Sequence, residues 1–257
     1  MFEQVKDILI AAGNIMTKTT EYSVTKKGKT DFVTDVDVSV QNFLIKELRN
    51  IIPDAEFMGE EKNNDDINWN HHVWIIDPID GTTNFLHGFL HSTISVALAY
   101  KKEIIMGIVY QPFTEELFYS ETGKGSYYNG EKIHVTNNTI ENGLIAIGTV
   151  PGCRTLANES FSIARQIYDR CHDIRRIGCA SYEMCYLAAG KLDGFVELSL
   201  KPWDYAAGML ILKEAGGKCC TPYGKELRLD EASGIVAGNE CIFEEIYDLV
   251  NFEMSKG

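Results

Sequence analysis

The sequence predicts an α+β protein whose two halves meet near residues 136–143. Apolar residues at helical spacing open the chain, and β-rich runs divided by turn residues fill the stretch from Thr93 to Val135. Short strands at even spacing need only tight turns, so this stretch is typical of an antiparallel meander. After Asn142 the pattern changes to alternating strands and helices. We therefore expect one compact fold, with an α+β half over residues 1–140 and an α/β half over residues 141–257.

Two amphipathic helices are expected at the start of the first half. Apolar side chains recur every three or four residues over residues 5–16 and again over residues 38–52, where Pro53 closes the second helix. A polar stretch containing Lys26 separates the two helices and reads as a solvated loop or hairpin tip. The first half should thus place two helices against its meander.

The second half is expected to contain four strands and four helices in alternation. Strands are predicted at residues 144–150, near 174, at 195–198 and at 235–237, and helices at 160–170, 184–190, 203–215 and 241–252. Alternation of this kind favours a sheet covered by helices.

Charge and hydropathy exclude several classes of function. The chain has 24 basic and 37 acidic residues, a net charge of −13 that repels phosphate backbones and anionic lipid surfaces. No apolar run approaches the ~20 residues that a membrane-spanning helix needs. The amphipathic, acid-containing start is unlike a secretory signal peptide, so we expect a cytoplasmic protein that binds neither nucleic acid nor membrane.

The seven cysteines form an odd set without a Cys-x-x-Cys pair. Neither a disulfide framework nor the spacing of zinc ligands is present. We expect these thiols to be reduced and mostly buried as small apolar groups.

Acidic residues gather where predicted strands end or helices begin. The four clusters are residues 31–37, Glu60-Glu61, Asp77 with Asp80, and Asp204. One cluster alone would pass for surface charge, but together they offer the hard oxygen ligands that Mg²⁺ prefers. The proline inside Asp77-Pro78-Ile79-Asp80 favours a tight turn that directs two carboxylates and a carbonyl to neighbouring cations.

The residues directly after this acidic segment suit a phosphate group. Gly81-Thr82-Thr83-Asn84 reads as the start of a helix, whose free N–H groups bind phosphate without a cationic side chain. The hydroxyl of Thr82 is also able to relay a proton from a water molecule to a carboxylate.

Three motifs give the chain a resemblance to a known family. Gly-Glu-Glu at residues 59–61, WIIDPIDGTTNF at 74–85 and KPWDYAAG at 201–208 occur in the order found in the inositol monophosphatase family, and the similarity extends over essentially the whole chain. The resemblance implies a layered αβαβα sandwich and a Mg²⁺-dependent, lithium-sensitive phosphatase of small phosphate esters. It also implies a homodimer.

The resemblance also assigns roles to residues at matching positions. It implies that two or three Mg²⁺ ions are held by Glu60, Asp77, the Ile79 carbonyl, Asp80 and Asp204. Asp37 and Thr82 would orient and deprotonate the attacking water, with Glu60 as a further acceptor. Substrate contacts are implied for Gly81, Thr82, Glu197, Gly178, Cys179 and Ala180, and supporting roles for Lys26 and Glu61. The family often has Ser or Thr where Cys179 stands.

The expected reaction is direct attack of water on phosphorus, most simply on inositol 1-phosphate. Two metal ions would activate the water and stabilise the leaving alkoxide. Fructose bisphosphate and the 2′-phosphate of NADP remain alternative substrates. A different alternative is a regulatory module that keeps the fold and binds RNA or protein, although the full ligand set and the net charge of −13 argue against it.

Overall fold

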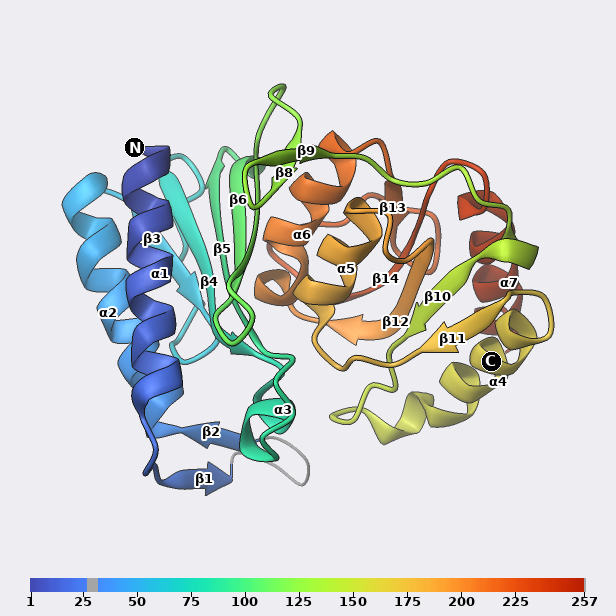
Figure 1. Cartoon of the computed structure of the whole chain (residues 1–257), viewed down its shortest axis with the longest axis horizontal. Coiled ribbons are helices and arrows are strands. Elements are labelled where there is room, and N and C mark those ends of the chain that lie inside the picture. The colour runs from blue at the N-terminus through green and yellow to red at the C-terminus, as the bar shows by residue number, and fades with distance from the viewer. Residues whose placement is uncertain (27–31, 257) are drawn as a thin grey trace.

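The computed structural model describes residues 1–26 and 32–256 and arranges them in five layers. Figure 1 shows, from left to right, a helix pair, a large sheet, a second helix pair, a smaller sheet and a third helix pair. The predicted α+β class and the implied αβαβα sandwich are both confirmed. No helix in the described ranges is long and apolar enough to cross a membrane.

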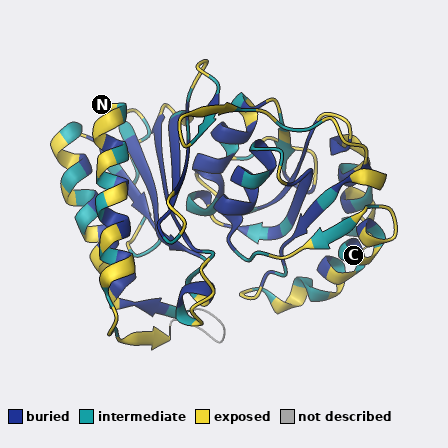
Figure 2. Ribbon diagram, viewed as in Figure 1, coloured by how far each residue is buried: buried dark blue, intermediate teal, exposed yellow. Residues whose placement is uncertain are grey.

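The first helix layer consists of α1 (Phe2–Lys18) and α2 (Asp35–Ile51). The second helix begins before residue 38, the predicted start, because Thr34 caps it by accepting the N–H groups of Val36 and Asp37. The carboxylate of Asp37 accepts the N–H of Thr34 in return, at 2.8 Å. The apolar faces of both helices pack on the large sheet, and their exposed faces point outward (Figure 2).

The large sheet has the strand order β3-β4-β5-β6-β7-β8-β9. Its strands are β3 (Glu56–Gly59), β4 (His72–Asp80), β5 (Thr93–Tyr100), β6 (Glu103–Gln111), β7 (Glu116–Glu121), β8 (Ser126–Tyr128) and β9 (Glu131–Ile133). From β4 to β9 each strand pairs antiparallel with the next, so the predicted meander is confirmed. Only β3 pairs parallel, with β4.

The middle layer consists of α5 (Ala180–Ala188) and α6 (Pro202–Glu214), which are buried between the two sheets. Pro202 starts α6 at a position where its missing N–H costs nothing. The helix lies close to β6, since a Cβ on Gly107 would stand 2.7 Å from the Ala207 carbonyl oxygen. This layer belongs to the second half of the chain but completes the core of the first.

The smaller sheet has the order β11-β10-β12-β14-β13 and is covered on its outer face by the third helix pair. Its strands are β10 (Leu144–Ile147), β11 (Asp173–Arg175), β12 (Gly194–Leu200), β13 (Lys218–Cys220) and β14 (Ser233–Gly238). The covering helices are α4 (Ala157–Tyr168) and α7 (Phe243–Met254). The remaining elements are α3 (Thr82–Leu86), the hairpin β1 (Val24–Lys26) with β2 (Phe32–Thr34), and 3₁₀ turns at Ile140–Asn142 and Arg154–Leu156.

The prediction of a tight turn at Asp77-Pro78-Ile79-Asp80 is wrong. Strand β4 continues to Asp80, and its pairing with β5 is irregular between Asp77 and Asp80. A proline is tolerated at such an irregularity because its missing N–H would otherwise break the ladder. The antiparallel pairing of β1 with β2 agrees with the hairpin alternative for this stretch, whereas the short strand β13 was not predicted.

The prediction that the cysteines are mostly buried is wrong. All seven cysteines are free, but only Cys179 and Cys185 are buried, and Cys241 is exposed.

Candidate active site

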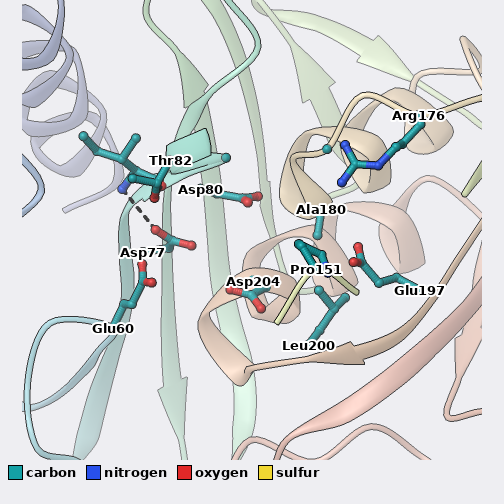
Figure 3. Close-up of a pocket in the computed structure, with 13 residues that line it drawn as sticks. Glu60, Asp77, Asp80, Thr82, Pro151, Arg176, Ala180, Glu197, Leu200 and Asp204 are labelled. Carbon is teal, nitrogen blue, oxygen red and sulfur yellow. Dashed lines mark hydrogen bonds between the residues drawn. The ribbon is translucent and has the colours of Figure 1, made fainter. Parts of the chain in front are cut away.

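A pocket of about 150 Å³ lies where the end of β4 meets the starts of α5 and α6 (Figure 3). Its lining residues come from both halves of the chain: Glu60, Asp77, Ile79, Asp80, Gly81, Thr82, Pro151, Arg176, Gly178, Ala180, Glu197, Leu200 and Asp204. In Figure 3, Glu60, Asp77 and Thr82 face Glu197 and Arg176 across this space.

Most of the residues singled out from the sequence meet here. All the predicted metal ligands line the pocket, as do Gly81, Thr82, Gly178, Ala180 and Glu197. Asp37, Cys179, Lys26 and Glu61 are not among its described lining residues.

Three of the carboxylates are anchored through one oxygen each. Asp77 accepts the N–H of Ile79 at 3.0 Å, and Asp204 accepts the N–H of Lys201 at 2.7 Å. Asp80 accepts both the N–H and the hydroxyl of Ser181, at 2.7 and 2.6 Å. A carboxylate held in this way has a fixed orientation and a second oxygen for another ligand.

Burial and mutual repulsion make this cluster electrostatically unfavourable on its own. Burial raises the pKa of Asp77 well above its usual value, and the charges of Glu60, Asp80 and Asp204 raise it further. The pKa of Asp204 is likewise raised well above normal, first by burial and then by Asp80. Such a set favours any cation that enters the pocket.

The donor set fits magnesium. Among the described residues no group of three or more Asp, Glu, His or Cys side chains is already arranged around one point. Mg²⁺ commonly keeps several waters and takes one or two carboxylates plus substrate oxygens, so it does not need such a cage. Hard oxygens from Glu60, Asp77, Asp80, Asp204 and the Ile79 carbonyl line a single pocket, which suits this mode of binding.

Asp37 and Thr82 each neighbour one of the predicted metal-binding residues. The hydroxyl of Thr82 donates to the Ile79 carbonyl at 3.0 Å. Asp37 uses Oδ2 to cap α2, whereas its buried Oδ1 has no hydrogen-bond partner among the described residues. Its charge also adds to the raised pKa of Asp77, which places the two carboxylates near each other. The predicted pairing of Asp37 with Thr82 stays a prediction.

Glu197 closes the opposite side of the pocket. It accepts the N–H of Val150 at 3.3 Å, and its carboxylate packs so closely on Gly148 that a Cβ there would lie 2.4 Å from Oε2. Burial raises the pKa of Glu197 to about 8, and the nearby Glu183 contributes to the shift. Glu197 is therefore a partly buried acid with one hydrogen bond to the loop at Val150.

Cys179 is close to the pocket but points into the protein. Its thiol is buried, and Sγ lies 3.4 Å from the Asp80 carbonyl oxygen and 3.3 Å from the Thr93 hydroxyl. Burial raises the pKa of this thiol well above normal, which favours the less reactive protonated form.

The two residues predicted in supporting roles lie outside the lining. Lys26, at the exposed end of β1, has Nζ 6.0 Å from the centre of the Phe32 ring. The N–H of Glu61 donates to Gln41 at 3.0 Å, and the charge of Glu61 helps raise the pKa of Asp37, after burial. The other loop residues considered at 27–31, including the first acid of the 31–37 cluster, lie outside the described residues.

Three lining residues were not predicted: Pro151, Arg176 and Leu200. Arg176 is the one cation among the described lining residues, and its Nε donates to the Thr149 hydroxyl at 2.9 Å. Its place two residues before Gly178 was the available signal. Pro151 and Leu200 carry no chemical signal and are brought here by the fold alone.

Comparison with known proteins agrees with the geometry. The profile of the family described as "Inositol monophosphatase family" matches residues 3–255. "Inositol-1-monophosphatase" of Rhizobium meliloti is 37% identical over 88% of this chain and 85% of its own, and "Nus factor SuhB" of Escherichia coli K12 is 35% identical over 95% and 93%. The solved structure of a Thermotoga maritima IMPase superposes with a TM-score of 0.88 at 31% identity, covering 99% of this chain and 98% of that one.

Proposed function

The chain belongs to the inositol monophosphatase family, and from this premise we propose that it is a Mg²⁺-dependent hydrolase of small phosphate monoesters, with inositol 1-phosphate as substrate. The observation that carries the proposal is the pocket itself. Carboxylates from both halves raise one another's pKa there, and Arg176 is the one cation among the described lining residues.

Metal binding is assigned to the residues whose oxygens line the pocket. Glu60, Asp77, Asp80, Asp204 and the Ile79 carbonyl would hold two or three Mg²⁺ ions. Bound there, the ions would acidify the attacking water and offset the charge of the phosphate and of the leaving oxygen.

Thr82 and Asp37 are proposed to receive the proton of the attacking water. The water oxygen forms a bond to phosphorus as its proton passes through the Thr82 hydroxyl to Asp37. The bond between phosphorus and the leaving oxygen breaks, the leaving oxygen takes a proton from solvent water to give the alcohol, and Asp37 returns its proton to solvent. The orphaned Oδ1 of Asp37 supports this role, because a buried acceptor without a donor is ready for a proton. Glu60 is a second acceptor on the same side.

Gly81 and Thr82 are proposed to contact the phosphate. Gly81 caps α3 with a φ of 82°, a backbone conformation that is strained for a residue with a side chain. A Cβ at Gly81 would also meet the His91 carbonyl oxygen at 3.1 Å and the Cys179 Cβ at 3.2 Å. Glycine is therefore required at this turn, where the N–H groups of Gly81 and Thr82 would meet the phosphate oxygens.

The leaving group is proposed to lie against the second half. Glu197, Gly178 and Ala180 line that wall, and a carboxylate there accepts hydrogen bonds from neighbouring hydroxyls. Cys179 would contribute through its backbone, since its thiol is buried. This polar wall favours a polyol over an apolar alcohol.

The names of the relatives leave a second function open. Relatives called inositol-1-monophosphatase and relatives called Nus factor SuhB are about equally similar to this chain. A regulatory module would not need carboxylates held in mutual repulsion at one pocket, whereas a metal-dependent phosphatase does. Fructose bisphosphate and NADP remain alternative substrates of the same site.

Phosphate release from a panel of esters tests the proposal. We expect release from inositol 1-phosphate that needs Mg²⁺, stops on chelation and is inhibited by Li⁺, with slower release from fructose bisphosphate and NADP. No release from any ester at saturating Mg²⁺ would overturn the enzymatic function. Faster release from fructose bisphosphate or NADP would change only the substrate.

A further inference from the structure

Two buried side chains outside the pocket lining hold the backbone of one pocket wall. The wall is the segment of residues 176–180, which contributes Arg176, Gly178 and Ala180 to the lining. Asn84 and Glu183 contact this segment from different sides and are absent from the described lining. Asn84 belongs to the Gly81-Thr82-Thr83-Asn84 segment but received no role of its own from the sequence, and Glu183 was not singled out.

Asn84 gathers carbonyl groups from two distant parts of the chain. Its side-chain nitrogen lies 2.8 Å from the His91 carbonyl oxygen, 2.9 Å from that of Ile177 and 3.3 Å from that of Gly178. Two of these carbonyls also border Gly81, since a Cβ there would lie 3.1 Å from His91 O and 3.3 Å from Gly178 O. One amide thus ties the wall to the phosphate-binding turn.

Glu183 holds the amide side of the same peptides. Its Oε1 accepts the N–H of Ile177 at 2.8 Å and that of Gly178 at 3.4 Å. The side chain is fully buried, and Oε2 has no hydrogen-bond partner among the described residues. A buried acid whose second oxygen has no partner is unfavourable for folding once it is ionised, which points to a role outside folding.

The two contacts fix where Arg176 stands. Gly178 has a φ of 81°, and a Cβ on it would lie 2.4 Å from Nη1 of Arg176, so the guanidinium rests directly on this glycine. A shift of the Ile177–Gly178 peptide would therefore move the cation and the wall together. Asp77 and Asp204 are held by other contacts, to Ile79 and Lys201, whereas Asp80 is held by Ser181, directly after the wall, and by Ala180 within it.

We propose that Asn84 and Glu183 are positioning residues that set the leaving-group wall against the phosphate-binding turn and so determine how a polyol is oriented. The proposal rests on the phosphatase function proposed above. In this proposal the wall orients the leaving group, whereas Gly81 and the metal carboxylates would hold the phosphate. A misplaced wall should harm substrates that use it and spare those that do not.

Steady-state kinetics of Glu183→Ala with two substrates tests this separation. We expect KM for inositol 1-phosphate to rise about 10-fold or more, since small displacements of positioned groups are costly. With 4-nitrophenyl phosphate, which has no hydroxyls to orient, kcat and KM should stay within about twofold. Asn84→Ala should give the same split, and Glu183→Gln, which keeps an acceptor for both amides, should restore most of the loss.

A matched control is Glu159→Ala on α4. Glu159 also carries a buried oxygen without a partner among the described residues, but it lies in the outer helix layer. This variant should leave both substrates unaffected. Equal losses with both substrates in Glu183→Ala, or no rescue by Glu183→Gln, would overturn the positioning role.

Hydrogen exchange separates this proposal from the proposed function. Amide exchange in the peptide covering residues 176–180 should accelerate in Glu183→Ala and stay near the wild-type rate in Glu183→Gln. Unchanged exchange in Glu183→Ala would overturn the proposal even if the enzyme is fully active. A wild-type protein that hydrolyses no ester would overturn the proposed function, whereas accelerated exchange in Glu183→Ala would still support the positioning of the wall.

Discussion

Two buried acidic sites in this chain have opposite surroundings. Glu116, at the start of β7, is 7% exposed and accepts hydrogen bonds from the side chains of Thr114, Tyr128, Tyr182 and Lys191. Burial alone would raise its pKa, but these donors outweigh it and lower the pKa of Glu116 to about 2. This acid is stable as a carboxylate without any outside partner.

The pocket carboxylates have fewer donors: Asp77 and Asp204 each accept one backbone N–H, and Asp80 accepts the N–H and hydroxyl of Ser181. Asp77 is 2% exposed, and after burial the largest causes of its raised pKa are the other acids, Glu60, Asp80 and Asp204. The difference teaches how to tell a structural buried acid from a functional one. Hydrogen-bond donors of the protein stabilise the charge of a structural buried acid. The charge of a functional buried acid is instead stabilised by a ligand that binds to it.

Asp77→Asn breaks the comparison on the pocket side and should have the largest effect. We expect turnover to fall by about 10³-fold, because the metal site supplies several kcal/mol of transition-state stabilisation. The metal-free protein should melt no lower than wild type, since one repelling charge is gone. Near-normal phosphate release by this variant would refute the metal assignment.

Thr82→Ala tests proton transfer without removing a carboxylate. Loss of the relay should lower kcat by about 10²-fold, with the Mg²⁺ concentration for half-maximal rate nearly unchanged. Rate measurements across a Mg²⁺ titration check both values. If kcat at saturating metal is normal but a higher Mg²⁺ concentration is needed for the half-maximal rate, Thr82 takes part in metal binding instead.

Glu116→Gln breaks the comparison on the structural side. Lys191 would lose its counter-charge, and we expect the free energy of unfolding to fall by about 2 kcal/mol. Urea denaturation measures this loss, and kcat per folded molecule should stay within about twofold. A large fall in kcat with unchanged stability would mean that this cluster serves the reaction.

The pH dependence of stability tests the comparison through the smallest expected effect. Burial raises the pKa of Glu183 from 4.5 to about 7, so the folded chain keeps this proton while the unfolded chain releases it. Its contribution to stability is full below pH 4.5 and is lost as the pH rises through 7.

Between these pH values, the free energy of unfolding of wild type should fall more steeply than that of Glu183→Gln. The difference in slope should be at most about 1.4 kcal/mol per pH unit, the value for one proton. Denaturant melts in chelator at several pH values measure it. Glu116→Gln is the control, because the pKa of Glu116 is about 2 and its titration is complete below this range. An unchanged slope in Glu183→Gln would contradict the raised pKa.

Local patterns predicted much of this molecule. The helices over α1 and α2 and the meander from β5 to β9 follow from periodicity and turn residues that lie close together in the sequence. The acids at the ends of β3 and β4 were located for the same reason. Their convergence with Asp204 followed from the family resemblance, since spacing alone cannot bring distant segments together.

Contacts between segments that lie far apart in the chain could not be predicted from the sequence. The donors to Glu116 come from residues 114, 128, 182 and 191, which no local pattern connects. Glu183 reads as one more helix residue until the fold places it under the Ile177–Gly178 peptide. The proline in Asp77-Pro78-Ile79-Asp80 indicated a turn, and only pairing with β5 shows that the strand continues through it.

Thermal melting during a Mg²⁺ titration tests the central claim most directly, in wild type, Asp77→Asn and Glu116→Gln. A ligand at 100 times its Kd adds about 2.7 kcal/mol of stability, so the Tm of wild type should rise by about 5 °C. Glu116→Gln should start lower and rise by the same amount, and Asp77→Asn should lose most of the rise. No Mg²⁺-dependent shift in wild type, or an equal shift in Asp77→Asn, would contradict the account that the pocket carboxylates are completed by cations.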